Sequence, residues 1–435
     1  MLSCLGIFVD KNLIKYAKVK KSKDNYKVEA FNVEVFDDLE KTLEKIILET
    51  DSIKTPISIN TSNELYNYFD VYSLLEKKDI TKSLDIEFEM LCDQKGYDKK
   101  ALESRYILMD NREDPDKFKS MYISVNKNDI EQKVENLSKY RLGSISPVST
   151  SITNLINGNE DENIAIINIE NETQITTVIK GQINRVDILD TGMEKAVSAI
   201  NKVEMSWKKS YDAFRNITIY SQDVKSLNED ENEYIDVVMP VLYKIDEETK
   251  KIFKNSKERI DKIYISGTGA IINNIDLYFQ DFLNGIRCEI LKPFFIDTTS
   301  LKFPIKEYIE VNSAISLALD GLGFVNKDLN FSPISKFDNV DLDSLEEFEV
   351  KDWKELLKDP LNINEKVLVR IIAVFIIAII GFSTLGGNIM KRIQSQTEDV
   401  KAKIAQTDAN LENMNNELEK IEEQIRLELK LQRID

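Results

Sequence analysis

Short runs of apolar residues alternate with polar ones at the start of the chain. Runs over 5–9, 14–20 and 26–35 are rich in aliphatic and aromatic residues and are separated by Asp, Lys or Asn. This alternation predicts three consecutive strands joined by turns, a meander and not a crossover. The arrangement recurs over 164–192, and helical sequence follows from Glu194 to Trp207. The repeat predicts an internal duplication within an α/β fold.

A different unit lies late in this part of the chain. An apolar strand over 261–265 leads into the turn Gly267-Thr268-Gly269, then into an amphipathic helix through Ile275 and Phe279, and then into a second strand over 287–291. A glycine turn between a buried strand and a helix lets backbone amides face an anion or a sugar. Gly267, Thr268 and Gly269 are therefore candidate nucleotide-binding residues.

One segment is apolar on every side. Residues 371–390 carry no charge, and roughly 20 residues at about 1.5 Å each match the hydrocarbon thickness of a bilayer. We predict a transmembrane helix over 366–390, with a buried core helix as the alternative. The first 20 residues lack the pattern of a signal peptide, so we expect the large segment before the span to be cytoplasmic and the tail to lie outside, with the protein in the cytoplasmic membrane.

The tail over 391–435 has an apolar seam. Apolar residues and two threonines recur in alternating four- and three-residue steps between Glu, Lys, Gln and Asn, as in a heptad repeat. A helix with one such stripe needs a partner helix, so we predict an extracytoplasmic coiled coil; a lone solvated helix is the alternative. The seam is formed by Val400, Ile404, Leu411, Met414, Leu418, Ile421 and Ile425, continued at its start by Ile393, Thr397 and Thr407.

The body over 1–330 and the span are joined by an acidic segment, 331–365, which contains two prolines and lacks a sustained core pattern. Such composition is typical of a linker. We therefore expect a folded body on a tether.

Composition narrows the possible functions. A net charge of -18 disfavours binding to a nucleic-acid backbone. The absence of histidine excludes Ser-His-Asp and Cys-His catalysis and imidazole-ligated metals. Three cysteines that are far apart suggest neither a zinc knuckle nor a disulfide framework. We expect no metal site and no catalytic residues.

The duplicated body together with SGTGAIINNIDLYFQDFLNGIRCEILKPF resembles the actin-like ATPase superfamily, and within it the PilM proteins of type IV pilus assembly. The small-residue run 312–322 and the helical run 237–253 are similar to helices of the PilM body. The resemblance implies an actin-like body, built from duplicated ribonuclease-H-like halves, with an inserted subdomain at about 66–146 that contains a helix over 80–92.

The span and coiled coil resemble the N-terminal half of PilN, the bitopic partner of PilM, fused here to the body. PilN proteins begin with a peptide that docks in a PilM groove, and 328–333 is similar to it. The resemblance implies that Leu329 and Phe331 are apolar anchors and that Asn330 bonds to backbone in a groove beside the inserted subdomain; the start of a linker is the alternative. It also implies a PilO-like bitopic partner for the coiled coil.

The phosphate-binding hairpins depart from the pattern of the superfamily. Where the fold implies an Asp near the metal and a Gly beside the phosphates, the first hairpin has Phe8 and Asp10, and the second has Asn168 and Glu170. Phenylalanine offers no oxygen to a metal, and a carboxylate repels phosphate. A shift of two residues would instead put Asp10 on the catalytic position. ATP with Mg²⁺ is disfavoured as a cofactor, and we expect no other.

The resulting hypothesis is a non-enzymatic scaffold of the type IV pilus assembly platform, which links a cytoplasmic motor to partner helices outside. Self-association of the chain stays open. Three alternatives are a component like the L protein of type II secretion, an active membrane-bound ATPase, and a cell-division anchor like FtsA.

Overall fold

The computed structural model describes residues 2–22, 25–111, 114–156, 162–219, 234–296, 304–324 and 326–333. The chain divides into two compact units, Met1–Ser335 and Lys336–Asp435, and every described residue belongs to the first. The predicted span, the coiled-coil seam and the linker after 333 lie outside the described residues. Within the described part of the chain, no helix combines the length and the apolar character that a membrane crossing requires.

The first lobe is a five-stranded sheet with the order β3-β2-β1-β4-β8. Its strands are β1 (Leu2–Asp10), β2 (Leu13–Ser22), β3 (Asn25–Val35), β4 (Ile57–Asn60) and β8 (Leu142–Ser146). The first three are antiparallel neighbours, and β1, β4 and β8 are parallel. Helix α1 (Leu39–Glu49) connects β3 to β4 and begins at Asp38, whose side chain accepts a hydrogen bond from the backbone of Lys41.

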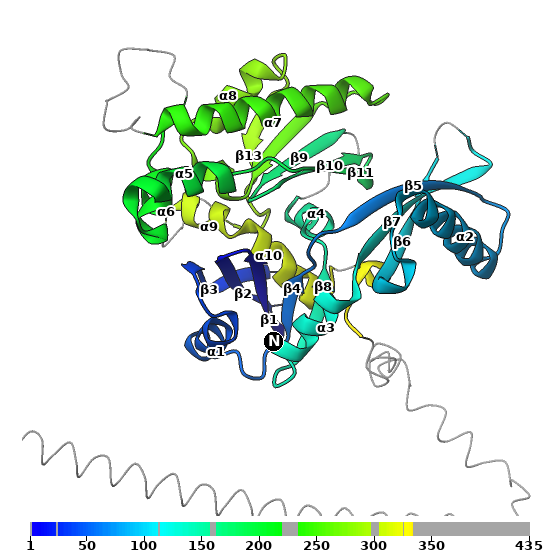
Figure 1. Cartoon of the computed structure of the whole chain (residues 1–435), viewed down its shortest axis with the longest axis horizontal. Coiled ribbons are helices and arrows are strands. Elements are labelled where there is room, and N and C mark those ends of the chain that lie inside the picture. Colours follow the sequence, from blue (N-terminus) through cyan, green and yellow to red (C-terminus); the bar gives the residue numbers. More distant parts are fainter. Residues whose placement is uncertain are drawn as a thin grey trace, which may run out of the picture. The chain divides into compact units, whose positions relative to one another are not determined.

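The second lobe repeats this topology. Strands β9 (Ile164–Ile169), β10 (Thr173–Ile179), β11 (Gln182–Leu189), β12 (Lys262–Ser266) and β13 (Arg287–Ile290) have the order β11-β10-β9-β12-β13. Again three antiparallel strands are followed by two parallel ones. The duplication predicted from the sequence is confirmed, and Figure 1 shows the two sheets in separate lobes.

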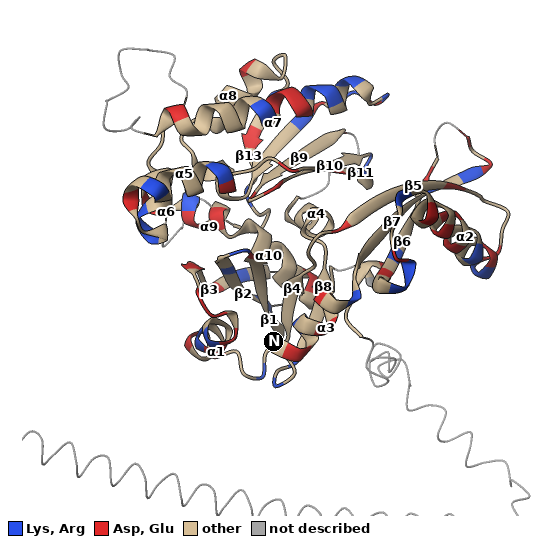
Figure 2. Ribbon diagram, viewed as in Figure 1, with Lys and Arg blue, Asp and Glu red and all other residues tan. Residues whose placement is uncertain are grey.

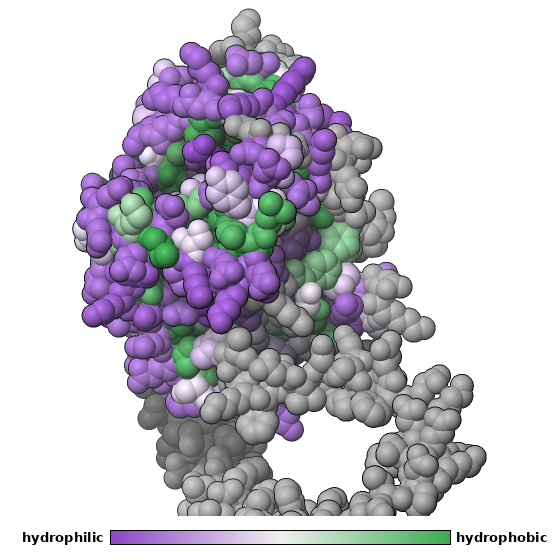
Figure 3. All heavy atoms as spheres, turned by 90° about the vertical axis from the view of Figure 1, so that its right-hand side faces the viewer, coloured by the Kyte–Doolittle hydropathy of each residue, from purple (hydrophilic) through white to green (hydrophobic). Residues whose placement is uncertain are grey.

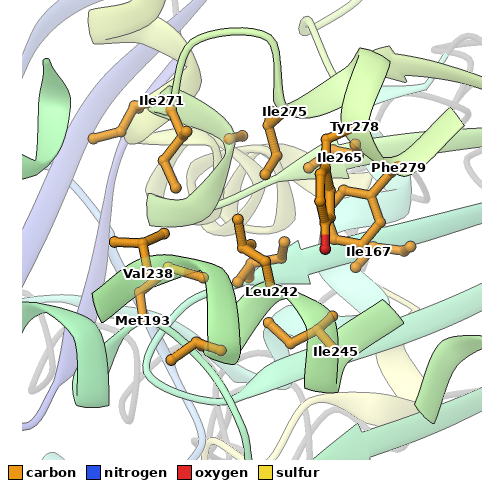
Figure 4. Close-up of a cluster of buried hydrophobic side chains, with 14 of the residues drawn as sticks. Ile167, Met193, Val238, Leu242, Ile245, Ile265, Ile271, Ile275, Tyr278 and Phe279 are labelled. Carbon is orange, nitrogen blue, oxygen red and sulfur yellow. The ribbon is translucent and has the colours of Figure 1, made fainter. Parts of the chain in front are cut away.

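Helices cover the second sheet and close its core. They are α5 (Glu194–Glu204), α6 (Trp207–Arg215), α7 (Ile235–Asn255) and α8 (Ile275–Phe282). The prediction of one helix from Glu194 to Trp207 missed a break, because Met205 adopts a left-handed conformation with φ 52° and Ser206 begins α6. The core joins strand, turn and helix residues (Figure 4): Ile167, Met193, Val238, Leu242, Ile245, Ile265, Ile271, Ile275, Tyr278 and Phe279.

A third sheet lies within the stretch between β4 and β8. It consists of β5 (Leu65–Tyr72), β6 (Leu102–Asp110) and β7 (Lys117–Asn126), with β7 in the middle. Helix α2 (Lys77–Lys95) covers it, and a 3₁₀ turn (Lys99–Ala101) follows. The residues that α2 buries repeat every four positions and include Leu84 and Phe88. The chain returns through α3 (Lys127–Asn136) to β8, which pairs with β4.

The side of the molecule that bears this subdomain is mostly hydrophilic but has apolar areas (Figure 3). Large apolar side chains of the subdomain are exposed at its outer loop, on the outer face of α2 and on β6. They are Tyr72, Leu74, Leu75, Ile86, Met90, Tyr97 and Leu108. Exposed apolar areas of this kind are typical of interaction surfaces.

Helix α10 (Asn312–Leu319) packs between the two lobes, preceded by α9 (Ile305–Glu310) and flanked by α4 (Val148–Ser151) and the 3₁₀ turn Ile152–Leu155. All eight residues of α10 are buried, and none is charged (Figure 2). Small residues allow close contact with β1. A Cβ on Gly6 would lie 1.9 Å from the carbonyl oxygen of Ala314 and 2.5 Å from the backbone nitrogen of Ala318.

We predict that Gly6→Ala lowers the free energy of unfolding by at least about 2 kcal/mol, because a methyl group there overlaps the backbone of α10. Gly143→Ala, on β8, is the matched control. Its nearest neighbour would be the hydroxyl of Ser58 at 3.1 Å, so we expect a loss below about 1 kcal/mol. Urea unfolding of both variants measures the difference. Equal losses would contradict direct contact between α10 and β1.

Candidate functional site

Two turns face each other between the lobes. One joins β1 to β2, and the other, 170–172, joins β9 to β10. The backbone N–H of Asn171 donates to Oδ2 of Asp10 over 3.2 Å. Lys11 and Glu194 form an ion pair between the same two lobes. The structure therefore brings together the two turns in which the sequence placed the altered phosphate-binding residues Asp10 and Glu170.

The central interaction of this cleft is a buried ion pair. Nζ of Lys15 lies 2.6 Å from Oε2 of Glu170, and the exposed fractions of the two side chains are 0% and 7%. Alternation along β2 directs Lys15 toward α10, on the face that also carries Ala17 and Val19. An ammonium group at such depth requires an anion and hydrogen-bond acceptors. The pair therefore joins β2 of the first lobe to the β9–β10 turn of the second.

Two further residues complete the environment of the Glu170 carboxylate. Thr268 donates to Oε2 from its backbone N–H over 3.1 Å and from its hydroxyl over 2.7 Å. The hydroxyl of Ser313 donates to Oε1 over 2.7 Å. Lys15 also donates to Oγ1 of Thr268 over 2.9 Å. Both carboxylate oxygens are thus bonded, and the contacts come from β2, the turn after β12, and α10.

Phe8 and Asn168 border this cluster without contributing a carboxylate. The ring centroid of Phe8 lies 5.7 Å from Nζ of Lys15, within the range of a cation–π contact. Asn168 is buried at the end of β9, and neither its amide nitrogen nor its amide oxygen has a hydrogen-bond partner among the described residues. Phe8 therefore supports the ammonium of Lys15, and Asn168 leaves polar groups unpaired.

The glycines of the turn after β12 pack against the end of β9. Gly267 has φ 83°, and a Cβ there would lie 2.6 Å from the carbonyl oxygen of Ile169. A Cβ on Gly269 would lie 2.7 Å from Cβ of Ile169. Both positions require glycine for this contact alone. The turn directs the N–H of Thr268 to the protein's own carboxylate.

A cavity of about 330 Å³ beside the ion pair has an acidic lining. Burial, followed by the negative charge of Glu170, raises the pKa of Asp10. Burial, followed by the charge of Asp10, raises the pKa of Glu172. In the described part of the chain, no three acidic or cysteine side chains are grouped as metal ligands. Because carboxylates repel phosphates, these residues do not fit a magnesium–polyphosphate group. The lining is Phe8, Val9, Asp10, Lys11, Asn60, Thr61, Ser62, Asn63, Glu64, Val148, Glu170, Asn171, Glu172 and Gln174.

The segment over 328–332 lies on the edge of β8. The N–H of Phe331 donates to the carbonyl of Ile145 over 2.9 Å. The Asn330 side-chain oxygen accepts the N–H of Ile145 over 3.1 Å and the N–H of Ser332 over 2.9 Å. Leu329 and Phe331 are buried in the core of the first lobe. The roles expected of Leu329, Asn330 and Phe331 thus agree with their contacts in the body.

Arg105 on β6 secures this segment from the inserted subdomain. Its Nε donates to the carbonyl of Asn330 over 3.2 Å, and its guanidinium carbon lies 5.3 Å from the ring centroid of Phe331. The groove that holds the segment is therefore formed by β8 and β6.

Sequence reasoning missed Lys15, Ser313 and Arg105 as site residues. A signal existed for Lys15, because it shares the otherwise apolar face of its strand with Ala17 and Val19. Nothing in the sequence indicated Arg105, because its contact with Asn330 spans 225 positions.

The carboxyl end of α10 holds a buried carboxyl group. Asp320 accepts hydrogen bonds from the hydroxyl of Ser151 and, over 2.7 Å, from the amide of Asn154. Burial raises its pKa to about 6. Together with Leu329, these residues line a small cavity of about 80 Å³. Asp320 thus joins the end of α10 to the turn after α4, next to the docked segment.

No protein-family model and no curated protein sequence matches the chain. Among solved structures, a chain of the PilM–PilN type IV pilus biogenesis complex is similar, with a TM-score of 0.59 and 13% identity over 73% of this chain and 98% of that one. The body has a PilM-like, actin-like fold. At this identity the similarity establishes the fold, and the activity has to be inferred from the residues.

Two other solved structures match the PilM-like body at lower TM-scores. The ethanolamine utilization protein EutJ from Carboxydothermus hydrogenoformans has a TM-score of 0.42 and 11% identity over 73% of this chain and 90% of that one. The cytoplasmic domain of EpsL, an inner membrane component of the type II secretion system of Vibrio cholerae, has a TM-score of 0.35 and 8% identity over 74% and 94%.

We predict that Asp320→Asn changes the pH dependence of stability between about pH 4 and pH 6. With a pKa raised to about 6, the folded state binds this proton more tightly than the unfolded state, so the contribution of Asp320 to stability falls as the pH rises through this interval and is constant above it. Urea unfolding at several pH values should show that the wild type minus Asn difference declines between pH 4 and 6. A difference independent of pH would contradict the raised pKa.

Proposed function

We propose that this chain is a membrane-tethered, actin-like scaffold of a type IV pilus assembly platform and that it does not hydrolyse ATP. The PilM-like fold supports the first part of the proposal, since the similar chain comes from a PilM–PilN complex. The residues between the lobes support the second part. In this proposal the grooves and surfaces of the body carry the function.

The observation that carries the proposal is the place of Glu170. In an actin-like fold the phosphates lie between two hairpin turns, and here one of these turns sends a carboxylate into that space. The carboxylate takes the ammonium of Lys15 and both donors of Thr268. An incoming phosphate would have to displace Glu170 and would then lie near Asp10. Binding of Mg-ATP is opposed at each of these points.

The docked segment supports a link between the body and its tether. Leu329, Asn330 and Phe331 lie at the point where the body passes into the linker 331–365. Because the segment is part of the same chain, its effective concentration at the groove is on the order of millimolar, and weak contacts are enough to hold it. In the proposal it takes the place that the resemblance assigns to a separate PilN peptide.

The remainder of the proposed arrangement extends beyond the described residues. The span over 366–390 anchors the body on the cytoplasmic face of the inner membrane. The coiled coil over 391–435 pairs outside with a PilO-like helix or with a second copy of this chain. Motor or platform proteins bind the body, and the exposed apolar side chains of the inserted subdomain are one surface for them.

We predict that the full-length protein in detergent micelles binds no Mg-ATP in calorimetric titration. A variant that combines Phe8→Asp, Asp10→Gly, Asn168→Asp and Glu170→Gly should bind it, because the substitutions remove both carboxylates from the turns and supply metal-facing oxygens. A thermal melt of the variant establishes that it is folded. Micromolar binding by the wild type would overturn the proposal and favour an active ATPase.

We predict that Asn330→Ala releases the docked segment. The substitution leaves the N–H of Ile145 without its acceptor, at a cost of about 1–3 kcal/mol, so exchange of this amide with deuterium should accelerate roughly tenfold or more. Asp328→Ala changes an exposed neighbouring side chain and serves as the control, with exchange at Ile145 as in the wild type. Unchanged exchange in Asn330→Ala would show that the segment does not depend on this contact.

A further inference from the structure

Four donors converge on the carboxylate of Glu170. They are the ammonium of Lys15, the N–H and hydroxyl of Thr268, and the hydroxyl of Ser313, at 2.6, 3.1, 2.7 and 2.7 Å. These donors belong to three elements that are far apart in the sequence, and Lys15 and Ser313 are completely buried. Such a set of donors is arranged to hold an oxyanion.

The donors are independent of the residue that they bind. Lys15 comes from the first lobe, Thr268 from the turn after β12 and Ser313 from α10, whereas Glu170 comes from the β9–β10 turn. The ammonium of Lys15 is the fixed cost of this arrangement, because a buried charge without a partner is strongly unfavourable. Whatever anion fills the space stabilises contact between β2 and the second lobe.

We propose that Lys15, Thr268 and Ser313 form a binding site for a small oxyanion and that Glu170 is its built-in ligand, which holds the two lobes together without a bound molecule. The inference concerns the same cleft as the proposed function and rests on its being closed to nucleotide. The class of ligand is a carboxylate, with orthophosphate as the tetrahedral relative that the same donors would bind.

Glu170→Ala in the full-length protein tests the site. This variant empties the donors and leaves Lys15 unpaired, so its Tm should fall by on the order of 5 °C. Acetate, which restores the lost carboxylate, should raise the Tm of this variant progressively at constant ionic strength, whereas chloride should not. Orthophosphate in a parallel titration shows whether the donors prefer a planar or a tetrahedral anion.

Lys15→Met/Glu170→Ala is the decisive control. It removes both charges, so it should melt above the single Glu170→Ala variant and should not respond to acetate, because an apolar side chain replaces the buried ammonium. Glu29→Ala removes the partner of Lys20 in an exposed pair and should show neither effect. Deuterium exchange at the amides of Asn171 and Thr268 should be fast in Glu170→Ala and should slow on addition of acetate.

Two results would overturn the inference. One is an equal Tm for Glu170→Ala and the double variant, which would make Glu170 a packing residue. The other is an equal response of both variants to acetate, which would place the anion elsewhere. Either result leaves the absence of ATP binding in the wild type untouched, and binding of Mg-ATP by the wild type is detected separately by calorimetry.

Discussion

An ammonium group remains charged in a protein interior only when an anion and hydrogen-bond acceptors accompany it. Lys15 is completely buried, and its anion, Glu170, lies 155 positions later in the chain. This requirement sets the approach of β2 to the β9–β10 turn. It also draws in Thr268 and Ser313, so that the turn after β12 and the start of α10 are positioned by the same pair. The arrangement of the two lobes depends on it.

The apolar contacts between the lobes have a different origin. Helix α10 lies close to β1 because Gly6 faces Ala314 and Ala318 without a side chain. Both sheets contribute to this layer, through residues such as Ala17 and Ile166. Polar contacts at the start of α10 and small-residue packing along its length therefore act together, and the helix serves both halves of the duplication.

Local periodicity accounts for most of what the sequence predicted correctly. Alternation identified the strands of both meanders, since their buried faces are set by neighbouring positions. The break at Met205 escaped prediction because both sides of it have helical periodicity, and a single left-handed residue ends α5. In the cleft, the positions of Asp10 and Glu170 followed from the hairpins, whereas the pairing with Lys15 depends on how the lobes meet. Long-range contacts of this kind leave no periodic signal.

The docked segment determines where mechanical load would enter the body. A pull along the linker first acts on the bonds that join Asn330 and Phe331 to Ile145, and on the bond from Arg105. Strand β8 passes tension to β4 and then to β1, which ends at Asp10 in the cleft. The carboxyl end of α10 is shielded from the pull as long as these bonds hold. Tension from the tether would thus be transmitted along one sheet to the contact between the lobes.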